Sequence, residues 1–218
     1  MMGGSLEGEA LGLASRRPWL PWALVVTFGL LLGVLAKLAD QSRIPGIGAI
    51  GTHMGFWVVV VTLIAVASPS RALAAARVAI CMGSVVIAYY LVTRWLFGVF
   101  PMSYFATWAF VALSLTPVFA ATVWSARSSG LAGCLASSLP AGFLLAEAWS
   151  FRFVLPLHGI EFAFDLIAAA LVLAVLGRPA SRLAIMLGFT IITGVAVRLV
   201  ASLIPYAAGV LSQFGLRF

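Results

Sequence analysis

Three charged residues stand inside stretches that are otherwise apolar. Glu161 and Asp165 lie four residues apart in the apolar run 159–176, a spacing that places both carboxylates on one face of a helix. Arg198 lies at a similar depth in the last apolar run. An intramembrane charge costs at least about 2.5–3.5 kcal/mol. The short connection 177–182 between the two runs predicts that their helices are antiparallel neighbours. We therefore expect Asp165 and Arg198 to pair across these helices, either as a clamp or as part of a ligand site.

Other charged residues gather at the same ends of the apolar runs. Lys37 and Asp40 stand at i, i+3 and can pair on one helix face. Arg94 ends the third run, where it either anchors to lipid headgroups or borders an elbow over a pocket. The candidate binding residues for a small polar solute are Lys37, Asp40, Arg94, Glu147, Glu161, Asp165 and Arg198.

Metal or nucleophilic chemistry has less support in the sequence. His158 and Glu161 are spaced so that two metal ligands could share a helix face, with His53, Asp165 or Glu147 as a third. Seven-helix membrane hydrolases use three histidines with acidic residues, whereas this chain has two histidines. No nucleophile motif of the GxSxG type is present. We expect no catalytic residue, metal or cofactor, and an enzyme remains the less favoured class.

The elements that position these residues follow from composition. Hydrophobic residues make up 63% of the 218 positions and charged residues 9%, against roughly 45–50% and about 25% in soluble domains. Runs of about 20 apolar residues cross a bilayer as helices, because lipid offers no partner for backbone groups. The sequence predicts an all-α polytopic transmembrane bundle of seven spans, or six if the short second run does not cross. These runs are 19–38, 52–67, 72–91, 104–124, 131–148, 159–176 and 183–204.

Domain organisation and orientation follow from polarity and arginine placement. Residues 1–17 are polar and small, which predicts a disordered cytoplasmic tail, and 18–218 form one transmembrane domain. Loop arginines favour the inner side of a membrane, so we expect the N-terminus inside. The acidic residues beyond the tail, and both histidines, His53 and His158, then lie in the outer half. The Arg, Ala and Gly richness favours a bacterial cytoplasmic (inner) membrane, with a multi-pass topology.

Small residues on the first span predict close helix packing. Gly29 and Gly33 form a GxxxG spacing that Ala36 extends, and such faces let helix backbones approach each other in lipid. The face could pack within the chain or against a membrane partner subunit. Although the formal charge is +7, no basic stripe with interleaved aromatics appears, so nucleic acid is not an expected partner.

Four strings resemble those of a family of small bacterial polytopic membrane proteins known only as a domain of unknown function. They are LLGVLAKLAD, GTHMGFW, AYYLVT and FGVFPMSYFATW, between residues 30 and 108. This resemblance implies no established activity. A looser resemblance is to the substrate-capture subunits of energy-coupling-factor importers, which hold a ligand near the outer face. Those subunits dock a coupling subunit through a small-residue motif that Gly29, Gly33 and Ala36 approximate.

Together these patterns favour an integral membrane protein that recognises or transports a small polar solute through a charged site in the outer half of the bundle. Two alternatives remain open at this point. One is a membrane-embedded enzyme, which a metal would assist. The other is a non-catalytic assembly partner whose charges only clamp helices. The sequence does not specify the solute, the energy source or the oligomeric state.

Overall fold

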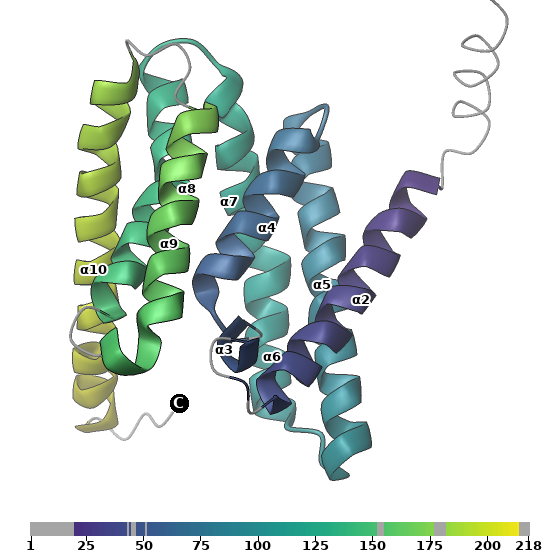
Figure 1. Cartoon of the computed structure of the whole chain (residues 1–218). Helices are drawn as coiled ribbons and strands as arrows, with labels where there is room; N and C mark the ends of the chain where they lie inside the picture. The colour runs from purple at the N-terminus through teal and green to yellow at the C-terminus, as the bar shows by residue number, and fades with distance from the viewer. Residues whose placement is uncertain are drawn as a thin grey trace, which may run out of the picture.

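The computed structural model describes residues 20–42, 44, 47–50, 52–151, 155–176 and 182–213, and the predicted tail 1–17 lies outside them. All regular structure within these ranges is helical (Figure 1). The elements in chain order are α2 (Leu20–Gln41), α3 (Ile47–Ile50), α4 (Met54–Ala67), α5 (Arg71–Phe97), α6 (Met102–Phe110), η1 (Val111–Leu115), α7 (Thr116–Trp124), η2 (Ser125–Arg127), α8 (Leu131–Phe151), α9 (Leu155–Leu176) and α10 (Leu183–Gln213).

The described helices confirm the predicted all-α membrane class. Six are long and apolar enough to cross a bilayer, namely Leu20–Gln41, Arg71–Phe97, Met102–Arg127, Leu131–Phe151, His158–Leu176 and Leu183–Leu203. The remaining apolar helix, α4, has 14 residues, so it rises about 21 Å and is shorter than the about 30 Å of hydrocarbon. The chain is thus a multi-pass membrane protein whose described residues contain six helices long enough to span a bilayer and the shorter helix α4.

Local sequence explains where these helices start, stop and distort. The Ser70 side chain accepts a hydrogen bond from the backbone N–H of Leu73 and caps the start of α5. Gly98 ends α5 with φ of 69°, a left-handed conformation in which glycine has no Cβ to clash. Pro117 lacks an N–H and crowds the preceding turn, which explains the π-helical segment η1 just before it.

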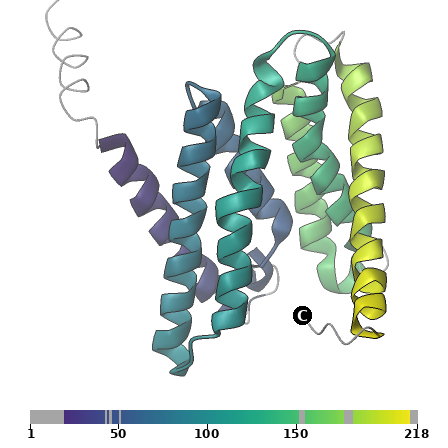
Figure 2. The same cartoon turned by 180° about the vertical axis from the view of Figure 1, so that it is seen from behind.

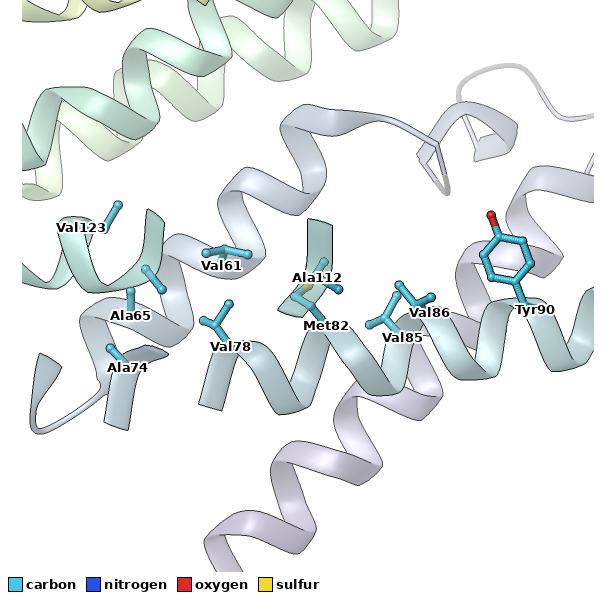
Figure 3. Packing of buried hydrophobic residues seen from close by; sticks show 11 residues of the cluster. Val61, Ala65, Ala74, Val78, Met82, Val85, Val86, Tyr90, Ala112 and Val123 are labelled. Carbon is cyan, nitrogen blue, oxygen red and sulfur yellow. The ribbon is translucent and has the colours of Figure 1, made fainter. Parts of the chain in front are cut away.

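The bundle has two groups of helices (Figures 1 and 2). One contains α2, α4, α5, α6 and α7, and the other contains α8, α9 and α10. Each has an apolar core. The first core, drawn in Figure 3, comprises Val61, Ala65, Ala74, Val78, Met82, Val85, Val86, Tyr90, Ala112, Ala120 and Val123. The second comprises Val58, Cys134, Ala141, Leu144, Ala168, Ala169, Leu173 and Met186. Helix α4 contributes to both cores and therefore joins the two groups.

The outward faces of the bundle are apolar, as lipid contact requires. On α2 and α10 the exposed large side chains include Leu24, Leu31, Leu35, Ile191, Ile192 and Leu199. The small face of α2 instead packs on α5. A Cβ built on Gly33 would overlap the carbonyl oxygen of Val85 and lie 2.8 Å from the Ala88 Cβ. The predicted close packing of this face is confirmed. Because α5 covers the face, the face is not available to a membrane partner subunit, which the sequence had left open.

Helix α8 lies between α9 and α10 and packs along both, whereas α9 and α10 touch only slightly. Its middle is built from small residues, and a Cβ on Gly142 would come within 2.6 Å of the Thr193 Cβ on α10. Small side chains allow close backbone approach on two sides of one helix. The expectation that α9 and α10 are direct neighbours, which rested on their short connection, is therefore wrong.

Candidate functional site

His53 lies where the two groups of helices meet, in the connection just before α4. Its Nε2 is 2.9 Å from Asp165 Oδ1 on α9, and its Nδ1 is 3.3 Å from Glu147 Oε1 on α8. The imidazole is buried, with 5% of the side chain exposed. One ring therefore links a carboxylate on each of two helices to the start of a third. We call His53, Glu147 and Asp165 the seam triad.

Glu147, which lies on α8, also caps the N-terminus of α4. Its Oε1 accepts a hydrogen bond of 3.0 Å from the backbone N–H of Met54, the first residue of α4. The His53 side chain does not cap this helix. The first N–H groups of a helix have no internal partner, and inside a bilayer no water supplies one. Glu147 thus allows α4 to begin within the bundle and places His53 beside Asp165.

Asp165 is the most buried member of the triad, with a side chain that is 0% exposed. Its Oδ2 atom has no hydrogen-bond partner among the described residues. A Cβ on Gly55 would overlap Asp165 Oδ1 and lie 2.9 Å from His53 Nε2. The absence of a side chain at Gly55 therefore creates the space in which the carboxylate and the imidazole meet.

A second histidine and carboxylate precede Asp165 on α9, with Glu161 about one turn and His158 about two turns away. His158 Nδ1 is 3.3 Å from Glu161 Oε1, and their side chains are 42% and 9% exposed. Phe151 stacks on His158 with ring centroids 5.1 Å apart, and it also lies 5.8 Å from the His53 ring. Exposure therefore falls from His158 to Asp165, so the polar residues lead from the end of the bundle into its interior.

The charge balance of this region is acidic. In the described ranges, the only basic side chains within 4.0 Å of the Glu147, Glu161 and Asp165 carboxylates are the two histidines. His53 lies outside the six spans. Burial lowers the pKa of its imidazole, but the Asp165 hydrogen bond and the charges of Glu147, Asp165 and Glu161 raise it more, so the net pKa lies above its ordinary value.

Lys37 and Asp40 form a separate polar cluster between α2 and α5. Lys37 Nζ is 2.8 Å from Asp40 Oδ2, as their i, i+3 spacing predicted. Tyr89 donates a 2.8 Å hydrogen bond to the same oxygen, and Lys37 Nζ lies 4.9 Å from the Tyr89 ring centroid. Because Lys37 and Asp40 neutralise each other, this cluster adds no net charge. Sequence analysis missed Tyr89, since no local spacing relates it to Asp40.

Two of the proposed residues do not join either cluster. Arg198 is exposed and donates a 3.1 Å hydrogen bond to Ser150 Oγ, while Asp165 contacts His53. The predicted Asp165–Arg198 pair is absent from the described ion pairs, because α8 separates the two helices. Arg94 is exposed in the last turn of α5. Glu147, Glu161 and Asp165 do come together, and so do Lys37 and Asp40.

A cavity of about 160 Å³ lies between α4, α5 and the α6–η1–α7 span. Its walls are mostly apolar, and it reaches toward both polar clusters. Thr52 and Met54, which flank His53, line one part, and Tyr89, which binds Asp40, lines another. Neighbours of both polar clusters thus line this partly open cavity, although His53, Glu147, Asp165, Lys37 and Asp40 do not line it themselves.

These features define a polytopic helical membrane protein whose buried acidic and histidine site is assembled from three elements. The chain belongs to a family of unknown function, DUF6518, whose family model matches residues 13–206. This membership confirms the resemblance to an uncharacterised family. Neither a curated protein nor a solved structure shows significant similarity to the chain.

Proposed function

We propose that this protein recognises a small polar solute of positive charge at the seam triad and carries it across the membrane. The observation that carries the proposal is the buried excess of carboxylates where the two groups of helices meet. Buried charges are stable only when paired or bound to a counter-ion. Because the permanent cations Lys37 and Arg198 have other partners, a solute cation is the group that would complete the site.

The position of the triad suits transport. Many transporters place substrate and ion sites where helices are interrupted at a boundary between structural units, with helix N-termini facing anionic groups. Here the anionic group at the start of α4 is Glu147, which leaves Asp165 to face a cation. Here α4 begins at Met54, and both helix groups contribute a ligand. Movement of one group against the other would open the site to either side in turn.

Entry from outside requires that the acidic end of the bundle face outward. We expect an impermeant maleimide to label Val99→Cys, in the connection between α5 and α6, in intact cells. Ser129→Cys, at the opposite end between α7 and α8, should resist it, because loop arginines are retained inside. The native Cys81 and Cys134 are buried and provide an unreactive background. Labelling of Ser129→Cys alone would place the acidic end in the cytoplasm.

The function itself is tested by ligand stabilisation followed by uptake. Purified protein would be melted in detergent with K⁺, Mg²⁺, Mn²⁺, Zn²⁺, putrescine or arginine. A ligand at 100-fold excess over its Kd stabilises the folded state by about 2.7 kcal/mol. We expect at least one cation to raise the Tm of the wild type and of Arg198→Gln, but not of Asp165→Asn. That cation should then enter proteoliposomes containing the wild type.

The two variants form a matched pair. Arg198 was an equal candidate by sequence, yet it is exposed and donates its described hydrogen bond to Ser150, away from the triad. Asp165 is fully buried in the site. Equal stabilisation of both variants by the active cation would show that it binds elsewhere. A panel without any stabilising cation, or an active cation that never enters vesicles, would contradict the proposed function.

A further inference from the structure

We infer that His53, Glu147 and Asp165 bind a divalent transition-metal ion. Each residue offers one ligand atom, and the three atoms lie within 4.8 Å of one another. Metal bonds to imidazole nitrogen and carboxylate oxygen are about 2.0–2.2 Å long, so ligand atoms on opposite sides of one ion are separated by about twice that length. The triad is therefore close to the dimensions of a metal site without any change in helix packing. This inference rests on the proposed function and names its solute.

The ligand set selects the kind of metal. Imidazole nitrogen suits zinc, copper, iron and nickel, whereas calcium and magnesium prefer oxygen ligands alone. Two carboxylates with one imidazole therefore favour Zn²⁺, Mn²⁺ or Co²⁺ over Mg²⁺ and Ca²⁺.

Charge and space both fit a cation. Asp165 Oδ2 is buried without a described partner, so an acceptor is available that the protein does not use. Glu161, one turn from Asp165 and 9% exposed, adds negative charge. Gly55 leaves the volume beside Asp165 Oδ1 and His53 Nε2 clear of side-chain atoms. Phe151 and Phe164 hold the His53 ring, with centroids 5.8 and 5.5 Å away. Packing thus holds the His53 ring in place, next to an Asp165 oxygen that is free to accept a cation.

This set of ligands differs from the His158, Glu161 and His53 combination that local spacing suggested. His158 is 42% exposed and contacts Glu161. The three tightly grouped donors come from distant parts of the chain. His158 and Glu161 instead line the more exposed approach to the triad. Removing His158 should therefore slow or weaken metal entry without abolishing the site.

Direct metal binding tests the inference. Full-length protein purified in detergent would be stripped with a chelator and titrated with Zn²⁺, Co²⁺, Mn²⁺ and Mg²⁺, with binding followed by calorimetry and metal content by mass spectrometry. We expect one Zn²⁺ or Co²⁺ per chain and no comparable binding of Mg²⁺. His53→Gln and Asp165→Asn should each weaken binding by more than the about 10–100-fold that loss of a supporting partner costs. Arg198→Gln should bind as the wild type does.

A second measurement on the wild type alone guards against variants that fail to fold. X-ray absorption at the zinc edge should show one imidazole nitrogen with oxygen ligands at about 2.0–2.2 Å. Sulfur ligands or several imidazoles would overturn the inference. So would unchanged affinity in a folded Asp165→Asn variant.

The metal site and the transport function can fail separately. If no metal binds but an organic cation stabilises the wild type and enters vesicles, the metal inference is overturned and the proposed function stands. The reverse outcome is also distinct. Zn²⁺ could bind at the triad yet never reach a zinc-sensitive dye inside vesicles of phosphatidylethanolamine and phosphatidylglycerol. The ion would then be resident, which supports the metal site and overturns the proposed transport.

Discussion

Replacing His53 with leucine should destabilise the metal-free protein by about 3–5 kcal/mol, the cost of leaving a buried charge without its partner. Asp165 has a fully buried side chain, and His53 is its described hydrogen-bond partner. Loss of the imidazole therefore leaves both carboxylate oxygens unpaired. Equilibrium unfolding with added SDS, in chelator-containing buffer, would measure the loss. Glu147 should contribute to the same effect through its 3.3 Å contact with His53.

A double-mutant cycle separates this interaction from general damage. Asp165→Asn removes the charge that His53→Leu leaves unpaired, so the double variant should be more stable than the sum of the single losses predicts. Residues in one ion-pair network couple by about 0.5–3 kcal/mol. Losses that add within the error of the measurement would show that the two side chains do not interact.

His158→Leu is the matched control for this experiment. His158 also contacts a carboxylate, at 3.3 Å, but 42% of its side chain is exposed. Solvent-exposed ion pairs contribute at most about 1 kcal/mol. The variant should therefore lose far less stability than His53→Leu, although both remove one imidazole. Equal losses would indicate that the two sites are equally accessible to water.

The second large effect is expected where α2 crosses α5. Gly33→Leu should destabilise the protein by at least about 3 kcal/mol, the upper end of the usual cost of overpacking. The first added atom would already overlap the backbone carbonyl of Val85. A backbone atom cannot rotate away, so α2 must move off α5. Gly33→Ala should show a smaller loss of the same sign in the same unfolding assay.

Gly188 on α10 provides the control. A Cβ at Gly188 would have nothing within 4 Å, and this residue is exposed on the bundle surface. Gly188→Leu should therefore leave stability unchanged or raise it slightly, since glycine costs about 1 kcal/mol in a helix interior relative to alanine. A destabilised Gly188→Leu together with a stable Gly33→Leu would contradict the packing of α2 on α5.

Sequence reasoning predicted features that depend on neighbours within a few residues. Lys37 and Asp40 pair at i, i+3 as their spacing predicted. His158 and Glu161, which their spacing placed on one helix face, lie 3.3 Å apart. The Gly29–Gly33 spacing identified a face that does pack closely. These succeed because helix geometry converts a spacing along the chain directly into a distance. The prediction that α9 and α10 are direct neighbours was wrong for the opposite reason. A short loop limits the distance between two helices at one end only, and it does not decide which helix faces pack together.

The sequence alone determined that this chain is a multi-pass helical membrane protein, because apolar runs in lipid must satisfy their backbone groups internally. It also determined that acidic residues and histidines gather toward one end of the bundle. The tertiary structure alone decided that Asp165 contacts His53 and that Glu147 caps α4. Small residues on α8, among them Gly142, let it lie between α9 and α10 and separate Asp165 from Arg198. His53 and Asp165 are 112 residues apart in the sequence, and only the packing of whole helix faces brings them together.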